Sequence, residues 1–164
     1  MKRAQIDAFC GCRETLYQRI VFFAAPAILL AGIVYVAVRY AQLPAEIPSH
    51  YNFYGEIDGY GSRGTLWITP VIGILCDALM LAVSFFPQTW NVGTSVTVFN
   101  RALVYRRVRD LIADIRLSTA VMFTAIAVCQ TALAPTFPWG MGVLIGVCCT
   151  APLVRFFVRL AMKK

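Results

Sequence analysis

The sequence predicts an all-α integral membrane protein, a bundle of four helices that cross the bilayer. The chain is 59% hydrophobic and only 14% charged, whereas soluble domains carry about 25% charged residues. Its apolar residues are gathered in blocks, and about 20 of them in a row suffice to cross a hydrocarbon core as a helix. Backbone groups in lipid must be bonded within their own segment, which favours helices. The blocks predict spans at about 20–38, 64–86, 117–134 and 138–156 of a single domain, 1–164.

The segment before the first block is basic, so this block could be read as a signal peptide. It is too long for the core of an ordinary signal, and residues 39–42 lack the small-residue pattern of a cleavage site. We therefore expect the block to remain as a helix. Residues 3–19 mix apolar and charged side chains and predict a lead-in helix at the membrane surface, broken near Gly11.

The loop 43–63 after the first block is rich in residues that restrict or reverse the backbone. Pro44 and Pro48 push the residues before them out of the helical region, so the first helix cannot continue through them. Glycines recur every few residues from Gly55 onward, and the pair at 58–59, Asp-Gly, is a strong turn signal. The loop is therefore predicted to be compact and ordered, with a short hairpin as one form it could take.

The second block contains one acidic residue, Asp77. An aspartate in the middle of a span costs roughly 2.5 to 3.5 kcal/mol on insertion scales unless it is paired or protonated, so it should face the bundle interior. Gln130 is a second polar residue within a span, and together with Thr124 and Thr131 it could bond Asp77. A structural hydrogen bond and a proton or ion path both remain open for Asp77.

The segment between the second and third blocks predicts an amphipathic helix over about 95–116. Its apolar positions recur at three to five residue intervals, and most of its arginines fall elsewhere on the helical wheel. We expect this helix to lie on the cytoplasmic leaflet and to run into the third span. It would be either a lipid-anchored connector or a docking surface for a cytoplasmic protein.

The positive charges predict how the protein is oriented. Of the fifteen Lys and Arg residues, thirteen lie in the first segment, in 87–116 or from Arg155 onward, whereas only Arg39 and Arg63 flank the loop 43–63. The positive-inside rule then places both termini in the cytoplasm and the loop outside. The net charge of +7 is explained by this topology and by anionic lipid of the bilayer, so nucleic-acid binding is not needed to account for it.

The loop also carries a long spaced pattern, Leu43-Pro44-x-x-Ile47-Pro48-x-His50-x-Asn52-x-x-Gly55-x-x-Asp58-x-x-Gly61-Ser62-Arg63. It resembles the signature of a bacterial membrane domain of unknown function, the amino-terminal domain also found in SdpI-type toxin immunity proteins. Arg63 stands where that signature normally has lysine. The likeness continues into 86–87, 90–91 and 100–107, and SdpI-type proteins usually carry further spans after this domain. The resemblance implies a multi-pass protein of the bacterial cytoplasmic membrane.

The resemblance also implies partners. In SdpI-type proteins the membrane part is thought to recognise a secreted peptide toxin and, in some members, to hold a transcriptional repressor at the membrane. By this likeness the loop 43–63 would meet a secreted peptide, and the basic helix 95–116 would meet a cytoplasmic protein. The sequence also leaves open whether the chain forms a homo-oligomer.

Within the loop, the candidate ligand-binding residues are His50, Asn52, Gly55, Asp58 and Arg63. His50 and Asp58, with Glu46, could also hold a divalent metal, because histidine combined with carboxylates suits zinc or another transition metal. The alternative is structural: these side chains would bond the loop backbone, and Arg63 would form an ion pair with Asp58 or Glu56. No other cofactor is indicated.

Three functions follow, in order of preference. No Walker, GxGxxG, HExxH or GxSxG pattern is present, which favours a non-enzymatic, immunity-like or peptide- and ligand-sensing membrane protein that acts through its outer loop. The second is a metal-dependent membrane enzyme with its site at His50, Asn52 and Asp58. The third is a small transporter that uses Asp77.

Overall fold

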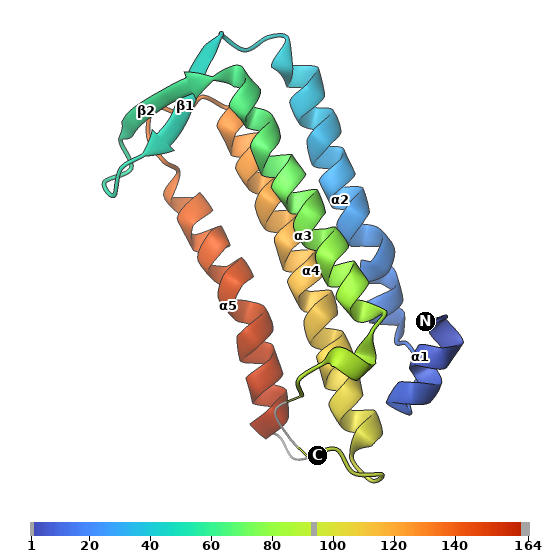
Figure 1. Ribbon diagram of the computed structural model, residues 1–164. Helices are drawn as coiled ribbons and strands as arrows, with labels where there is room; N and C mark the ends of the chain where they lie inside the picture. Colours follow the sequence, from blue (N-terminus) through green and yellow to red (C-terminus); the bar gives the residue numbers. More distant parts are fainter. Residues whose placement is uncertain (1, 93–94, 162–164) are drawn as a thin grey trace.

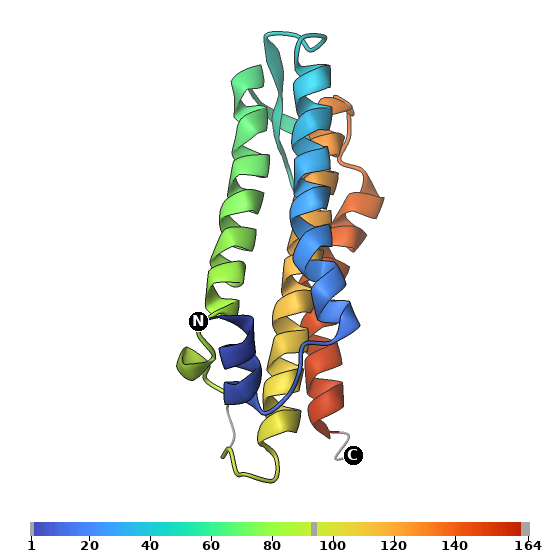
Figure 2. The ribbon, with the colours of Figure 1, turned by 90° about the vertical axis from the view of Figure 1, so that its right-hand side faces the viewer.

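Four long helices stand side by side in the computed structural model, which describes residues 2–92 and 95–161 (Figures 1 and 2). The elements are α1 (Arg3–Cys10), α2 (Leu16–Tyr40), β1 (Glu46–Tyr51), β2 (Ile57–Ser62), the 3-10 turn η1 (Arg63–Trp67), α3 (Ile68–Ser84), the 3-10 turn η2 (Pro87–Thr89), α4 (Arg101–Thr131) and α5 (Trp139–Ala161). The hairpin of β1 and β2 forms one end of the molecule, which we call the hairpin end. α1 and the last turns of α5 lie at the opposite end.

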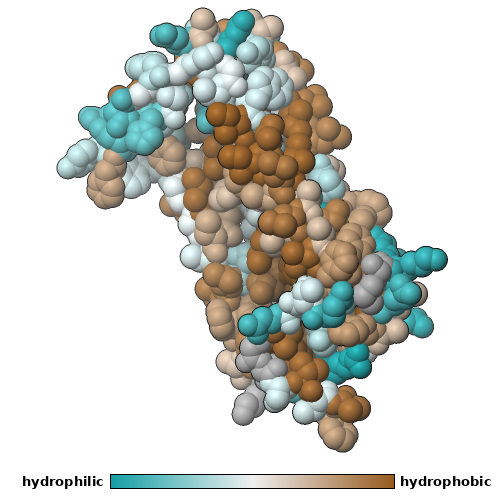
Figure 3. Space-filling view, viewed as in Figure 1, coloured by the Kyte–Doolittle hydropathy of each residue, from teal (hydrophilic) through white to brown (hydrophobic). Residues whose placement is uncertain are grey.

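The four predicted spans are confirmed as helices. α2, α3 with its 3-10 lead-in, α4 and α5 are each long and apolar enough to cross a membrane. In Figure 3 the apolar surface runs along the middle of the bundle, and polar residues gather at the hairpin end and toward the opposite end. The chain is accordingly treated as a multi-pass membrane protein. Lys163 and Lys164 of its basic tail lie outside the described residues.

The prediction of an all-α fold is wrong in one respect. The loop 43–63 forms an antiparallel two-stranded sheet, in which Glu46 pairs with Ser62, Pro48 with Tyr60 and Tyr51 with Ile57. The ladder is possible because the prolines hold extended backbone here and the loop turns back at 52–56. The lead-in helix is confirmed as α1, which ends at Gly11 in the left-handed conformation (φ 68°) that glycine adopts without strain.

The prediction for residues 95–116 also needs correction. Residues 95–100 are not helical, and α4 runs without interruption from Arg101 to Thr131, so 95–116 does not form a helix separate from the third span. The segment is amphipathic because its apolar residues, such as Ile112 and Ala113, pack inside the bundle and its charges pair with neighbouring helices. At 31 residues, α4 is about 46 Å long and exceeds a hydrocarbon core of about 30 Å.

α4 packs against α2 and α3 through small and aliphatic side chains. Val21, Ala25 and Leu29 of α2 form a buried cluster with Ala113 and Ala120 of α4. A Cβ on Gly32 would approach Thr124 to 3.0 Å, and one on Gly73 would approach both Leu29 and Phe123 to 2.9 Å. Small residues at such positions let membrane helices come close and gain dispersion energy.

α5 is attached differently. Its main neighbour is α4, and Pro152 is its one buried residue among those described. The other long helices each bury several residues, so α5 stands at the edge of a three-helix core (Figure 2).

Candidate functional site

The turn of the hairpin is fixed by the side chain of Asn52. Its Oδ1 accepts hydrogen bonds from the backbone N–H groups of Tyr54 (2.9 Å) and Glu56 (3.0 Å), and its Nδ2 donates to the Glu56 carboxylate (3.0 Å). Gly55 has a φ of 82°, a conformation that suits glycine. Two predicted ligand-binding residues, Asn52 and Gly55, therefore shape the loop itself.

His50 and Asp58 face each other across the ladder. The His50 Nδ1 lies 2.5 Å from the Asp58 Oδ1, and the two side chains are 72% and 43% exposed. An ion pair this exposed is worth little free energy because water screens it. The pair therefore orients the imidazole more than it stabilises the fold.

The other predicted ligands lie elsewhere. Arg63 does not pair with Asp58 or Glu56, as the structural alternative supposed: its guanidinium donates to the Leu43 carbonyl (3.2 Å) and lies 4.9 Å from the centre of the Tyr40 ring. Arg63 instead joins the base of the hairpin to α2, since Leu43 and Tyr40 are both at that junction.

The structure brings together two of the three predicted metal ligands. Glu46 pairs with Ser62 at one end of the ladder, and His50 lies four residues further along β1, about 13 Å at the rise of a strand. Within 2–92 and 95–161, no three His, Cys, Asp or Glu side chains gather in a way that could hold a metal ion.

The tip of the hairpin is tied to the connection between α4 and α5. The Phe137 N–H donates to the Gly55 carbonyl (2.7 Å), and the Tyr51 hydroxyl donates to the Ala134 carbonyl (2.9 Å). The Tyr51 and Phe137 rings meet edge to face at 5.7 Å. Burial raises the pKa of Tyr51, which keeps its hydroxyl protonated as a donor. The hairpin thus forms a roof over the start of α5.

Beneath this roof lies a cavity of about 440 Å³, which we call the hairpin groove. Its walls come from β1 and the turn, from α4 and from the α4–α5 connection with the first turns of α5: Pro48, Ser49, His50, Tyr51, Asn52, Phe53, Gly55, Ile126, Cys129, Gln130, Phe137, Trp139, Met141, Gly142 and Ile145. Small-molecule sites usually have about 300 to 1,000 Å³ and a mostly apolar lining with few polar groups. The hairpin groove meets this description.

Asp77 is paired inside the bundle, by Arg116, the last residue of the predicted amphipathic segment 95–116. The Arg116 guanidinium donates to both carboxylate oxygens, with Nε to Oδ1 at 2.7 Å and Nη2 to Oδ2 at 3.0 Å. Both side chains are buried. The predicted partners are wrong: Gln130 accepts a bond from Thr69 (2.9 Å), and Thr124 and Thr131 donate to backbone carbonyls.

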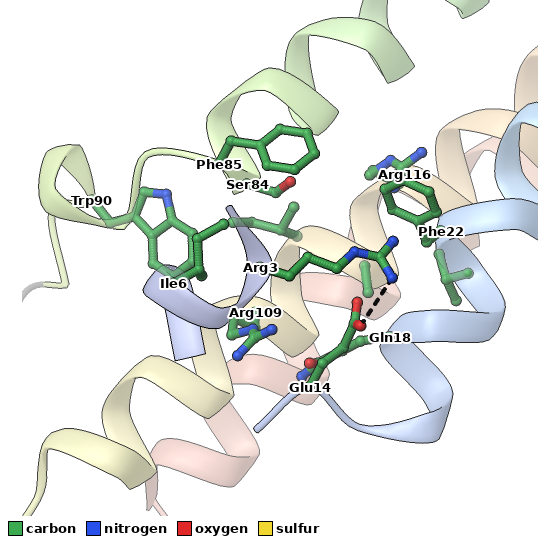
Figure 4. A pocket seen from close by; sticks show the side chains of 13 residues that line it. Arg3, Ile6, Glu14, Gln18, Phe22, Ser84, Phe85, Trp90, Arg109 and Arg116 are labelled. Atoms are coloured by element: carbon green, nitrogen blue, oxygen red, sulfur yellow. Dashed lines mark ion pairs between the residues drawn. The ribbon is translucent and has the colours of Figure 1, made fainter. Parts of the chain in front are cut away.

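A small pocket of about 70 Å³, lined by both charged and apolar side chains, lies beside this pair, at the end away from the hairpin (Figure 4). Arg3 points to Glu14 across it (3.6 Å), and the Phe22 ring lies close to both Arg3 (4.4 Å) and Arg116 (5.7 Å). The third arginine of the pocket, Arg109, bonds Asp7 at 2.8 Å. Each guanidinium is matched by a carboxylate, which indicates bracing between α1, α2, α3 and α4.

Two further ion pairs fasten α5 to α4 near the same end; we call them the α5 clamp. Arg155 donates to Asp114, which also accepts from the Tyr17 hydroxyl. Arg159 donates to Asp110 (2.6 Å), which also accepts from the Gln18 amide (2.7 Å).

The sequence analysis missed the α5 clamp, yet a signal was present. Asp110 and Asp114 are four residues apart, as are Arg155 and Arg159. Residues at this spacing share one face of a helix, so two such helices running in opposite directions can match both pairs.

Two comparisons with known proteins found a match. Residues 27–74, from within α2 to the first turns of α3, match the model of a domain of unknown function, DUF1648. An uncharacterized protein of Archaeoglobus fulgidus is 25% identical over 145 residues, which cover 79% of each chain. No solved structure matches. The matched residues include the whole hairpin, so the pattern predicted from the loop lies within a recognised domain.

Proposed function

We propose that this chain is a non-enzymatic membrane protein that binds an amphipathic ligand in the hairpin groove and acts in a ligand-sensing, immunity-like role. The observation that carries the proposal is the groove itself, a mostly apolar cavity of about 440 Å³ whose walls include the polar side chains of His50 and Asn52 on the hairpin and of Gln130 on α4. An apolar cavity with a few polar groups can bind and orient a ligand without any catalytic set.

The orientation is part of the proposal. The Lys and Arg bias supports a hairpin on the outer side of the cytoplasmic membrane, with α1 and the end of α5 in the cytoplasm. A secreted peptide could then reach the groove without crossing the bilayer. The exposed aromatic side chains of Phe53, Tyr54 and Trp139, at 96%, 80% and 83%, would meet it or the lipid interface.

A cytoplasmic partner at the other end is supported by the loop before α4. Val98 and Phe99 are 92% and 100% exposed, next to Arg101. Fully exposed apolar side chains beside a positive charge suit an acidic protein partner. Phe99→Ser should then abolish co-purification of that partner, whereas Tyr60→Ser at the hairpin should not.

The groove role can be tested by the sensitivity of cells to secreted antimicrobial peptides. Cells that make the wild-type chain should survive a toxic peptide that kills cells without it, and His50→Ala should reduce this protection. Glu46→Ala is the matched control, because Glu46 lies on the same strand but does not line the groove. Equal sensitivity of all strains across a broad peptide panel would sink the immunity role.

A divalent metal held by His50 and Asp58 is the competing proposal, supported by the position of the two side chains facing each other across the ladder. Elemental analysis of the purified protein decides it. Zinc or another transition metal at a stoichiometric level, lost in His50→Ala, would support a metal-dependent enzyme. Its absence, also after metal is added, would end that proposal.

A further inference from the structure

The hairpin groove is the first of three hollows along the seam between α4 and α5. The second, of about 200 Å³, begins about one turn further from the hairpin, at Met122 on α4 and Cys148 on α5. The third, of about 180 Å³, lies beside Asp114 and Arg155 of the α5 clamp. The seam is therefore hollow along most of its length.

The lining of these hollows changes from polar at the hairpin to apolar in the middle and to charged at the far end. The groove has polar groups at the hairpin, such as His50, and at Gln130 near the end of α4, and its walls deeper in are apolar, such as Ile126 and Ile145. The second hollow is lined mainly by apolar and weakly polar side chains, and the third ends at charged groups. An occupant that enters under the hairpin should therefore have a polar head and an apolar tail.

The length of the first two hollows sets the length of the tail. They extend along α4 from Gln130 to Ile115, a distance of about 22 Å at the rise of an α-helix. One leaflet contributes about half of the hydrocarbon core, or about 15 Å. The first two hollows are thus long enough for one extended chain of the hairpin-side leaflet, and the second adjoins the charged third hollow at Ser118 and Pro152.

The seam is also accessible from the bilayer and adaptable. α5 packs chiefly against α4, and α2 reaches it at the third hollow, through Tyr17. Met122, Met141, Cys129 and Cys148 line the first two hollows. Thioether and thiol side chains are soft and polarizable, and methionine in particular is common at surfaces that accept variable apolar partners.

We propose that the groove and the second hollow bind one hydrocarbon chain of a phospholipid from the hairpin-side leaflet, with its head group beside His50 and Asn52. This inference rests on the proposed function, since it names the amphipathic ligand of the same groove. A chain that occupies the seam fills the space that α5 leaves against α4. A secreted peptide that binds there has to displace the lipid.

The test uses the full chain in vesicles of phosphatidylethanolamine and phosphatidylglycerol that contain a phospholipid with a photoreactive group in its chain. After illumination, mass spectrometry locates the label. Ile126, Ile145 and Met122 should be labelled several-fold more than Ile72 and Leu75, exposed residues of α3. Equal labelling of both sets would overturn the proposal.

Two glycines of α5 provide a matched pair of variants. Gly142 lines the groove, so Gly142→Leu should fill it and reduce labelling of Ile126 and Met122 several-fold. A Cβ on Gly140 meets nothing within 4 Å and Gly140 does not line the groove, so Gly140→Leu should label like wild type. Ile126→Trp fills the same groove from α4, and serves if Gly142→Leu fails to fold. Unchanged labelling in a folded groove-filling variant would overturn the proposal.

A peptide arm separates this inference from the proposed function. Addition of a peptide that the chain protects against should lower the seam labelling if both proposals hold. Selective labelling without protection against any peptide would retain the lipid site and remove the immunity role. Protection without selective labelling would retain the immunity role and remove the lipid site.

Discussion

The two sides of α4 are packed in opposite ways. Toward α2 and α3 it closes on small residues, with Gly32 against Thr124 and Gly73 against Phe123, and it buries the Asp77–Arg116 ion pair. Toward α5 it leaves three hollows, and the contact is secured mainly at its ends, by the hairpin and by the α5 clamp. One helix thus serves both a close-packed core and a seam that can take an occupant.

The contrast teaches that apolar composition alone does not determine packing in a membrane. Lipid chains are as apolar as leucine, so a helix gains little by merely contacting another. Close packing requires small residues or internal polar partners at the contact, and α2 and α3 supply both. α5 supplies charges only near one end. Along the rest of its length, apolar contacts with α4 replace equally apolar contacts with lipid, so little free energy is gained.

The largest effect is expected from breaking the buried ion pair of the close-packed side. Asp77→Ala leaves the Arg116 guanidinium buried without its carboxylate, which should lower the free energy of unfolding by about 3 to 5 kcal/mol. Unfolding in mixed micelles with increasing sodium dodecyl sulfate measures it. The double variant Asp77→Ala with Arg116→Met should recover most of the loss, because no charge is then left unpaired. A double variant as unstable as the single one would show that the pair is not what the helices depend on.

A glycine-to-alanine substitution on α3 and another on α5 compare the packing on the two sides of α4 directly. Gly73→Ala places a Cβ 2.9 Å from Leu29 and Phe123, and such overpacking should cost about 1 to 3 kcal/mol. Gly146→Ala on α5 meets nothing within 4 Å and should be neutral or stabilising by up to about 1 kcal/mol through helix propensity. The same unfolding assay measures both. Equal effects of the two variants would contradict the difference in packing.

Removal of the α5 clamp should affect α5 alone. Arg155→Ala combined with Arg159→Ala removes two partly exposed ion pairs, each worth up to about 1 kcal/mol. Amide hydrogen exchange should become faster in α5 and stay unchanged in α2 and α3. Arg106→Ala, an exposed arginine of α4, is the control. Faster exchange throughout the bundle would mean that α5 belongs to the same cooperative core.

At the hairpin, Asn52→Ala removes three side-chain hydrogen bonds of the turn. Because water can replace part of each bond, worth about 0.5 to 1.5 kcal/mol when intact, the loss should be small and local. Proteolysis at 52–56 should become faster, while unfolding of the bundle stays unchanged. Tyr60→Ser, on the other strand, should leave the rate as in wild type.

Thiol reactivity gives a comparison without any loss of stability. Cys10 is buried between α1 and α4, where burial raises the pKa of its thiol from 9.0 to about 11. At pH 8 its reactive thiolate is therefore about 100-fold scarcer than in an ordinary thiol of pKa 9. Cys10 should resist alkylation until the chain unfolds, whereas membrane-soluble reagents should reach Cys148 and Cys149 at the seam. Rapid labelling of Cys10 in the folded protein would contradict its burial.

The spans could be predicted from sequence because length and apolarity alone decide whether a segment can cross lipid. The hairpin pairing could not, since the ladder depends on register and on the bond between Gly55 and Phe137, which are far apart in sequence. Arg116 was counted among the cytoplasmic charges of 87–116 because charge counting treats every arginine near a span as solvated. Its carboxylate partner, Asp77, lies on another helix, and such pairing is a tertiary property.

The spacing of the α5 clamp has a consequence for how the last helix docks during insertion. The two acids of α4 and the two arginines of α5 match in antiparallel order, Asp114 with Arg155 and Asp110 with Arg159. A slip of α5 by one turn, about 5.4 Å, would bring Arg155 opposite Asp110 or Arg159 opposite Asp114 and leave the other two charges without a mate. The four charges thus select a single axial register of α5 against α4, whereas the apolar surface of α5 alone would allow several.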